Sequence, residues 1–494
     1  MSECYKLLML VILFLAGIRT IHAQKLLTLD LAMDIAMENS PDIRRTLLDL
    51  ERSRESLNAQ NAALKSNFRL TLNPFSISRD NVFNTFLSAW SSSDTKSSLG
   101  TFIVSQPIVR TDGTLTLTNR FSWQNSYSEY AKDKRNIAFN NNLYLSFDQP
   151  IFTYNRTKLQ LKQLELNLES SQITFALQKL SLERQIAQSF FNLYQNKLNL
   201  DITTEEMKNN EQNFDIIKNK VDAGLLALEE LYQAELNLAS SRSNLQNRQV
   251  TLENAFENFK LLIGLPLTEN ITIEADTTYQ LVKVDLDKAL KTALSNRMEL
   301  RQRNISLENA QFSLVQTMAQ NEFKGNISLS YGITGTDQTF SNLYDKPTEK
   351  ETIGISFEIP LWDWGENKSR VKASQASIQT QKLSLENEIN NITIAITQAY
   401  RSLDNLVNQI EIARQSVRNA ELTYEINVER YKNGDLTGMD LNLYQTQLSQ
   451  RRISLVQALI DYKLALLNIK ILSLWDFEKN QPVLPEILTY ANNR

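Results

Sequence analysis

The sequence predicts a mainly α-helical protein made of two copies of one unit, in which a helix, two strands, a long helix and a final helix follow one another. Two motifs, each repeated 210 residues later, support this fold class. Long stretches with few helix breakers join the motifs, and the 494 residues include only 12 glycines and 9 prolines. Repetition at a fixed spacing is typical of a duplicated structural unit. The first motif pair is Leu145-Ser-Phe-Asp-Gln-Pro-Ile-Phe152 and Ile355-Ser-Phe-Glu-Ile-Pro-Leu-Trp362, and the second is Ala223-Gly-Leu225 and Asn433-Gly-Asp435.

The two repeats differ in length near their beginnings. We expect the first repeat at residues 24–265, a linker at 266–283, the second repeat at 284–475 and a tail at 476–494. Ala36 and Ala293 of the opening helices are 257 residues apart, so the first repeat holds 47 extra residues before its proline motif.

The extra residues fall in a segment that alternates between polar and apolar side chains. This segment, residues 67–149, predicts strands and loops, and its counterpart in the second repeat is residues 325–360. The alternation leaves open whether residues 99–121 add strands or form a loop.

Residues 1–23 are typical of a secretory signal peptide. Lys6 precedes an apolar run at residues 7–18, and Ala23 ends an acceptable cleavage site. A membrane anchor is the alternative, although this run is short for a span. Cleavage would remove Cys4 and His22, the only cysteine and the only histidine in the sequence. A mature chain without them has no means for thiol or histidine catalysis, disulfides or the usual zinc sites.

The net charge of −4 gives no electrostatic case for nucleic-acid binding. An enzyme is disfavoured, because the carboxylates are spread along helix faces and no glycine-rich phosphate loop is present. We expect no cofactor and no metal.

Apolar residues recur every seven positions along the long helices, as in helices that pack along one another. The first long helix carries two such ladders, five residues out of step. Five residues turn a helix by about 140°, so this helix has two apolar seams and can contact two neighbours. That suits the wall of a tube; a compact bundle is the alternative. The two ladders contain Leu161, Leu168, Phe175 and Leu182, and Leu166, Ile173, Leu180, Ala187 and Tyr194.

Together these features resemble the TolC-type family of outer-membrane efflux proteins, over almost all of residues 27–475. The proline motifs, the Ala-Gly-Leu and Asn-Gly-Asp turns and the two opening helices carry the resemblance. It implies a homotrimer in the outer membrane of a Gram-negative-type bacterium. In such a trimer a shared transmembrane β-barrel continues as an α-helical tunnel across the periplasm. It also implies passive exit for substrates that an inner-membrane transporter delivers through a periplasmic adaptor (membrane fusion) protein, in efflux or type I secretion.

The prediction of two strands per repeat agrees with sharing of the barrel. Four strands cannot close a barrel alone, and a sheet in lipid must have no free edge. Pro150 and Pro360 are expected where strand gives way to helix, a position where a missing N–H costs little. A periplasmic adaptor or a structural coiled-coil envelope protein is the alternative function. An adaptor, however, would have one helical hairpin, and two are predicted here.

The two glycine turns are expected to reverse the chain after each long helix, where a positive φ suits glycine. The resemblance implies that these turns dock onto the adaptor; simple helix caps are the alternative. The implied docking residues are Lys220, Ala223, Gly224, Leu225, Arg430, Asn433, Gly434 and Asp435.

The resemblance also implies a periplasmic gate near the turns, formed by Glu230, Tyr431 and Asp440. Asp440 matches the first acidic residue of the family's gate, whereas Leu443 occupies the place of the second. Leu436 stands where a linking arginine is expected, so we expect the closed state to be held more loosely. Ordinary surface charge is the alternative interpretation of Glu230 and Asp440.

Overall fold

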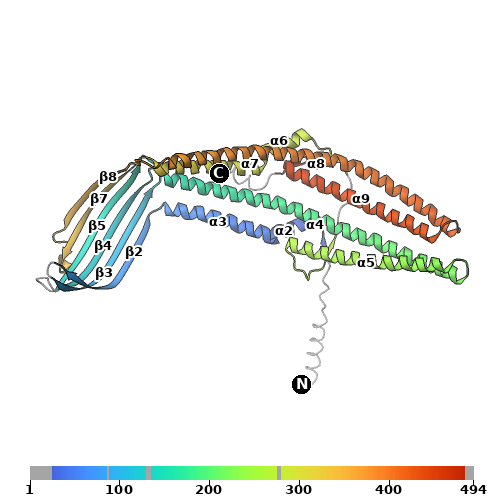
Figure 1. Ribbon diagram of the computed structural model, residues 1–494, viewed down its shortest axis with the longest axis horizontal. Coiled ribbons are helices and arrows are strands. Elements are labelled where there is room, and N and C mark those ends of the chain that lie inside the picture. Colours follow the sequence, from blue (N-terminus) through green and yellow to red (C-terminus); the bar gives the residue numbers. More distant parts are fainter. Residues whose placement is uncertain (1–24, 86–87, 129–134, 275–279, 484–494) are drawn as a thin grey trace, which may run out of the picture. The chain divides into compact units, whose positions relative to one another are not determined.

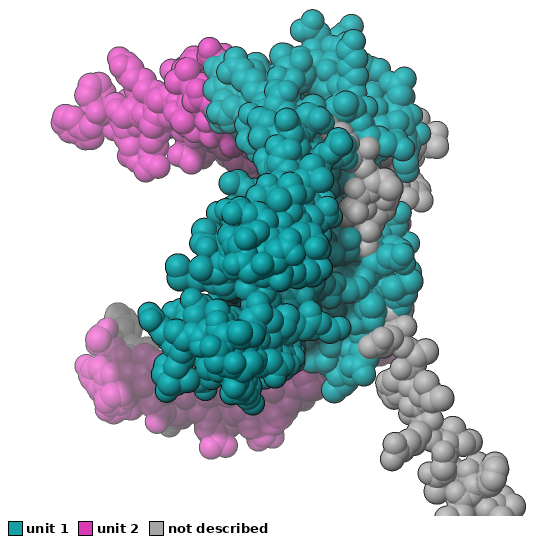
Figure 2. Space-filling view, turned by 90° about the vertical axis from the view of Figure 1, so that its right-hand side faces the viewer, with its two compact units in different colours: residues 1–48, 173–298, 388–494 teal, residues 49–172, 299–387 magenta. Residues whose placement is uncertain are grey.

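The computed structural model describes residues 25–85, 88–128, 135–274 and 280–483. The predicted signal peptide lies outside these residues. The chain divides into two compact units, coloured teal and magenta in Figure 2. Unit 1 comprises residues 1–48, 173–298 and 388–494, and unit 2 comprises residues 49–172 and 299–387. Each unit therefore combines segments of both repeats.

Each repeat contains a very long helix followed by a shorter one (Figure 1). Helices α4 (Arg156–Asp222) and α8 (Glu366–Lys432) both have 67 residues. Their partners α5 (Leu228–Ile263) and α9 (Gly438–Ser473) both have 36 residues. Every bound of one pair is separated from its counterpart by the spacing seen in the motifs, so the duplication extends to the whole of these helices.

The opening helix predicted for each repeat is a pair of helices in the structure. The first pair is α2 (Leu29–Asn39) and α3 (Pro41–Ala63), and the second is α6 (Leu286–Asn296) and α7 (Met298–Met318). Thr28 caps α2 by accepting the N–H of Leu31 at 3.4 Å, and Asp285 caps α6 in the same way. The two caps have the same separation as Ala36 and Ala293, which is the offset expected for the opening helices.

Several short elements complete the chain. Strand β1 (Lys25–Leu27) pairs in parallel with β6 (Ile271–Ile273), which lies before the second repeat. Strands β9 (Trp475–Asp476) and β10 (Gln481–Pro482) pair near the C-terminus. Two 3-10 turns, η1 (Ala319–Asn321) and η2 (Phe340–Asn342), flank strand β7.

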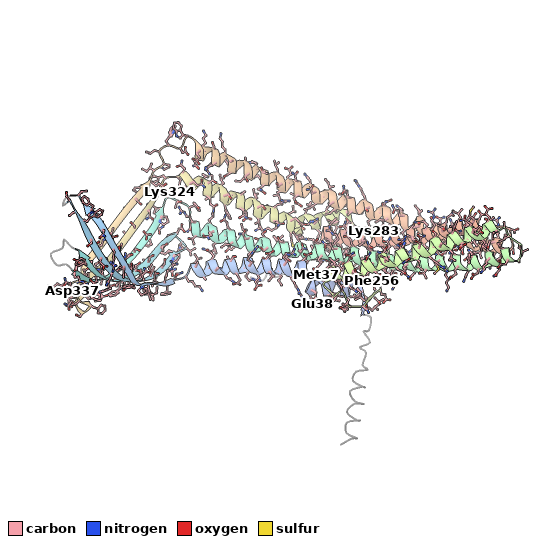
Figure 3. The ribbon with its side chains drawn as sticks, turned by 60° about the horizontal axis from the view of Figure 1, so that its bottom comes forward. Met37, Glu38, Phe256, Lys283, Lys324 and Asp337 are labelled. Atoms are coloured by element: carbon pink, nitrogen blue, oxygen red, sulfur yellow. The ribbon has the colours of Figure 1, made fainter. Side chains whose placement is uncertain are left out.

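One antiparallel sheet in unit 2 contains six strands of the described residues, in the order β2-β3-β4-β5-β7-β8 (Figure 1). In Figure 3, Lys324 and Asp337 mark the two ends of β7. The strands are β2 (Asn67–Asn84), β3 (Ala89–Ile108), β4 (Gly113–Ser128), β5 (Arg135–Ile151), β7 (Lys324–Asp337) and β8 (Thr348–Glu358).

The prediction of two strands per repeat is correct for the strands that the second repeat gives to this sheet and wrong for the first, which gives four described strands. Strands β2 and β7 begin at the same offset as the opening helices, and β5 and β8 both lead into the proline motifs. The extra residues of the first repeat therefore correspond to the hairpin of β3 and β4. Residues 99–121 add strands because their alternating side chains continue the register of β2 on one side and of β5 on the other.

The apolar ladders form the core of unit 1. Leu182, Ile186 and Leu193 of α4 pack with Phe259 of α5 and Ile460 of α9. A second cluster joins α8 to α9, through Leu403, Ile410, Tyr462 and Ile469. Figure 3 also places Met37 of α2 near Phe256 of α5, beside the first cluster. The prediction that α4 contacts two neighbours is confirmed, since its side chains pack against both α5 and α9.

Aspartates outside the long helices cap their first turns in unit 2. The Asp112 carboxylate, from the β3–β4 turn, accepts the N–H of Arg156 at 3.2 Å and of Thr157 at 3.0 Å. Asp363 accepts the N–H groups of Gly365 and Asn367 at the start of α8. These bonds to the charged form lower the pKa of Asp363, with the bond from Asn367 the largest cause.

Both motif prolines lie six residues before a long helix, as expected for strand-to-helix junctions. Pro150 is still inside β5, where it pairs with Asn326 of β7. The pairing of β5 with β4 ends at Asp148, so the missing N–H of Pro150 removes no bond to β4. Pro360 lies between β8 and α8.

Over the described residues, no helix combines the length and the apolar character needed to cross a membrane.

The two turns that end α4 and α8 close with the same hydrogen bonds. The N–H of Leu225 donates to the carbonyl of Lys220 at 2.8 Å, and the N–H of Asp435 donates to the carbonyl of Arg430 at 2.9 Å. Gly224 and Gly434 have φ of +74° and +86°. This is the Schellman arrangement, in which a left-handed residue completes the helix end. The expected positive φ at both glycines is confirmed.

Substituting Gly434 with alanine should loosen its turn. An alanine held at positive φ costs about 1 to 2 kcal/mol, so the amide of Asp435 should exchange its hydrogen on the order of tenfold faster. Hydrogen exchange followed by mass spectrometry on the tip peptide checks this. Asn433→Ala is the matched control, because Asn433 is not among the described residues with positive φ. Equal exchange in the two variants would contradict the assignment.

Candidate functional site

The implied docking residues lie at two exposed tips of unit 1. Leu225 is 73% exposed, and Gly224, Asn433, Gly434 and Asp435 are exposed with it. At the base of the tips, the structure brings Lys220 onto Tyr431, with its Nζ 5.0 Å from the centre of the ring. Lys220 is thus half-buried against an aromatic face, and the rest of the set is open to a partner.

A groove between the two hairpin ends, here the tip groove, gathers the three implied gate residues. Glu230, Tyr431 and Asp440 all line it, together with the docking residues Lys220, Gly434 and Asp435. Ala223, Gly224, Leu225, Arg430 and Asn433 are not part of its wall. The remaining lining residues are Ile217, Leu226, Leu436, Thr437 and Gly438.

Tyr431 is the most buried of the gate residues, at 6% exposure. Its hydroxyl is buried and has no hydrogen-bond partner within the described residues. Burial, and then the charge of Glu230, raise the pKa of this tyrosine, so it stays neutral near pH 7. The Tyr431 O–H therefore makes no hydrogen bond within the described residues of one chain and remains available as a donor.

Asp440 has a structural task in addition to its place in the groove. Its N–H donates to the Thr437 hydroxyl at 3.2 Å, and that hydroxyl donates to the Asp440 carboxylate at 2.7 Å. This reciprocal pair caps α9, and the helix dipole further favours a negative charge in the first turn. Ala227 holds the equivalent place before α5 and makes no side-chain cap. The Thr-x-x-Asp pattern was visible in the sequence, although the sequence analysis did not use it.

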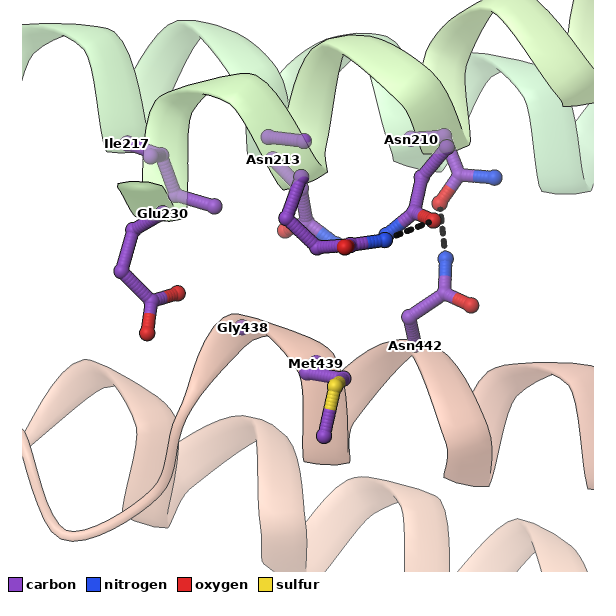
Figure 4. A pocket seen from close by; sticks show the side chains of 10 residues that line it. Asn210, Asn213, Ile217, Glu230, Gly438, Met439 and Asn442 are labelled. Carbon is purple, nitrogen blue, oxygen red and sulfur yellow. Dashed lines mark hydrogen bonds between the residues drawn. The ribbon is translucent and has the colours of Figure 1, made fainter. Parts of the chain in front are cut away.

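Sequence reasoning also missed a seam of polar side chains between α4 and the second hairpin. Arg452 of α9 forms ion pairs with Glu205 of α4 at 3.2 Å and Glu421 of α8 at 3.0 Å. Further along, Asn442 donates to Asn210 at 2.7 Å, a bond drawn in Figure 4. We call these contacts the polar seam. Its signal in the sequence was Arg452, a charged residue between Leu448 and Leu455, two apolar residues that are seven positions apart.

A small amide-rich pocket lies beside the polar seam. Figure 4 shows Asn210 and Asn213 facing Met439 and Asn442 across it. Asn210 is 6% exposed. Gln445, three residues after Asn442 in α9, is also buried and accepts a hydrogen bond from the Tyr424 hydroxyl at 3.0 Å. Such buried amides fix which residues of two helices lie opposite each other, because a slip would leave them unpaired.

Within the described part of the chain, no group of three or more His, Cys, Asp or Glu side chains is arranged to hold a metal ion.

Comparison with known proteins identifies the family of this chain. The model of the outer membrane efflux protein family matches residues 114–265 and 289–472. The cation efflux system protein CusC of Escherichia coli is 23% identical over 306 residues, which are 61% of this chain and 65% of CusC. The outer membrane protein TolC of Salmonella enteritidis is 22% identical over 361 residues, covering 70% of this chain and 71% of TolC.

Among solved structures, the CmeC outer membrane channel of Campylobacter jejuni has a similar fold. Its TM-score is 0.70 at 15% identity, over 94% of this chain and 88% of CmeC. The family match covers more than half of this chain, in both repeats, and the resemblance seen in the sequence is confirmed. The chain therefore belongs to the outer membrane efflux protein family, which places it in the outer membrane.

Proposed function

We propose that three copies of this chain form one outer-membrane channel, in which a shared β-barrel continues as a helical tunnel in the periplasm. The channel gives passive exit to substrates that an inner-membrane transporter delivers through a periplasmic adaptor. The observation that carries this proposal is the six-stranded sheet of unit 2, which has one apolar face, one polar face and two open edges.

The two faces follow from the register of the sheet. Residues that pair across neighbouring strands lie on the same face, and successive residues of a strand lie on opposite faces. Adjacent rows across the sheet are accordingly apolar and polar in turn. One row is apolar up to its last member, which is charged, and consists of Phe68, Val104, Leu117, Leu145, Tyr331 and Glu351; the next consists of Asn67, Ser105, Thr116, Ser146, Ser330 and Thr352.

The apolar face is large and uncovered in the single chain. Leu70 is 62% exposed and Ile353 is 77% exposed. A face of this kind needs an apolar environment, and alternating apolar and polar residues are typical of strands with lipid on one side and water on the other. The strands have between 11 and 20 residues, enough for the 9 to 11 or so that cross a bilayer.

Aromatic side chains flank the apolar face at both ends. Near the helices, the Phe323 ring lies 5.3 Å from that of Phe152 and 5.5 Å from that of Phe357. Aromatic girdles at the two interfaces are typical of membrane barrels. The cluster at the far end consists of Phe121, Phe139 and Phe340.

The open edges favour assembly of several copies. Among the described strands, β2 and β8 each have a neighbour on one side only. An unpaired edge costs several kcal/mol per polar group in lipid, so the edges must meet other strands. Pairing between copies satisfies both edges at once.

Assembly as a trimer predicts a heat-modifiable species in the outer-membrane fraction. Without boiling, the detergent-extracted protein should migrate near three times the 56.7 kDa of the chain, and boiling should reduce it to one chain. Gel electrophoresis of separated membrane fractions tests this. Recovery as a monomer in the soluble periplasm would favour an adaptor or a coiled-coil envelope protein instead.

The tips are the proposed docking surface for the adaptor. In a chain with Cys4→Ser, the substitution Asn433→Cys should form a cross-link in cells to an adaptor. The captured protein is recognised as an adaptor when its own sequence predicts a helical hairpin. The matched control is Glu411→Cys, an exposed position earlier in α8. The proposed docking site fails if both cysteines capture the same proteins equally.

Asp440 is the proposed gate charge. Asp440→Asn keeps a partner for the Thr437 hydroxyl and removes one negative charge per copy, so cation-over-anion permeability should fall roughly twofold or more. Single-channel recording in planar bilayers measures this ratio. Glu229→Gln is the control, since Glu229 is exposed and outside the tip groove. Unchanged selectivity in Asp440→Asn would leave Asp440 with its capping role alone.

A further inference from the structure

The additional hairpin of the first repeat is an integral part of the sheet. Strand β4 pairs with β3 from Gly113 to Ser128 and with β5 from Thr114 to Tyr127, almost its full length on both sides. The helix-side turn of the hairpin contains Asp112, whose carboxylate accepts two backbone hydrogen bonds from the first turn of α4 and so holds the turn against this helix. Strands β3 and β4 thus separate β2 from β5 and widen the sheet of each copy.

The two edge strands have complementary directions. Strand β2 begins at Asn67, shortly after the end of α3, and β8 ends at Glu358, shortly before α8. Both of these residues therefore lie on the helix side of the sheet. When β2 of one copy meets β8 of another with their helix sides together, the two strands run antiparallel, as all neighbours in this sheet do.

The register within one copy fixes how the helix-side ends are staggered. The row that begins at Asn67 crosses the sheet to Thr352. Strand β8 continues from there for six more residues, to Glu358. The helix-side ends thus shift by about one residue from each strand to the next. With roughly 3.3 Å per residue and 4.8 Å between strands, this shift corresponds to a strand tilt of about 35° from the barrel axis. Strands in closed barrels tilt by about this angle.

We propose that three copies close an 18-stranded barrel, six strands from each, in which β2 of one copy pairs with β8 of the next and Asn67 lies opposite Glu358. This inference rests on the proposed trimeric channel and adds its strand number and its seam. The same stagger of six residues then continues from copy to copy around the barrel.

The side chains at this seam are complementary. Phe68 falls opposite Phe357 and Leu70 opposite Ile355, so the apolar face continues across the junction. A slip by one residue would instead place these side chains opposite polar ones. On the polar face, Arg69 falls opposite Ser356 and diagonal to Glu358. Opposite charges at such diagonal positions stabilise paired strands.

The strand number changes the width of the passage. Barrel diameter grows roughly linearly with strand number at constant tilt. Without β3 and β4 each copy would supply four strands and the trimer twelve. Eighteen strands give a barrel about one and a half times as wide. The sheet end of the channel can therefore pass larger molecules than a twelve-stranded barrel at the same tilt.

Disulfide formation in the intact trimer tests the seam, in a chain with Cys4→Ser. The pair Arg69→Cys with Ser356→Cys should form covalent dimers and trimers on non-reducing gels, because residues directly opposite each other lie within disulfide reach. The matched control is Arg69→Cys with Thr352→Cys, which lies on the same face and strand but four residues out of register. The proposed seam is overturned if the trimer forms disulfides equally in both pairs, only in the control pair, or in neither pair.

Thiol labelling tests whether β3 and β4 belong to the barrel wall. In the reconstituted trimer, Thr116→Cys should react with a water-soluble maleimide, whereas Leu117→Cys, its neighbour on the apolar face, should react at least about tenfold more slowly. Equal labelling of the two would mean that the hairpin lies outside the wall, which overturns the 18-stranded barrel. Absence of any trimer in the unmodified protein would overturn the proposed function instead.

Discussion

The alternation of side chains in the six-stranded sheet is the constraint on which the rest of this structure depends. Each residue of a strand belongs to one face, and the register of all six strands gathers most of their apolar residues on the same face. The register cannot slip by one position without reversing every side chain of a strand. The direction of each strand is fixed with it, and so is the side of the sheet from which α4 and α8 leave.

Packing between long helices imposes a second constraint, through contacts of two kinds. The two apolar clusters bury residues such as Ile186 and Ile410 completely. The polar seam adds Arg452 with its two glutamate partners and the Asn442–Asn210 bond. Apolar contacts stabilise helices at many relative heights, whereas the buried amide of Asn210 is satisfied at only one. The polar seam therefore sets which residues of α4 and α9 lie opposite each other.

The tips combine helix capping and the proposed gate in one small region. The Schellman turns at Gly224 and Gly434 are alike, but the helices that follow begin differently. Helix α9 has the Thr437–Asp440 cap, and α5 begins after Ala227 without one. Tyr431, whose buried hydroxyl has no hydrogen-bond partner in the described part of the chain, belongs to α8. Two hairpins of equal length therefore present different chemistry to the tip groove.

The sequence by itself determined the features that depend on neighbours along the chain. The scarcity of glycine and proline and the seven-residue ladders predicted the long helices, whose bounds repeat at the same spacing as the motifs. The positive φ of Gly224 and Gly434 and the junctions at Pro150 and Pro360 were also predictable, because local backbone geometry dictates them.

Only the tertiary structure decided the features that depend on distant partners. Residues 99–121 alternate between polar and apolar side chains, as a strand does. Whether they join a sheet depends on pairing with β2 and β5, which the local sequence pattern does not predict. The meeting of Lys220 with Tyr431, and of Arg452 with Glu205, joins residues that are far apart in the sequence. Such contacts depend on how whole helices pack against one another. The packing is determined by many residues along the chain, so the sequence around either partner does not predict the contact.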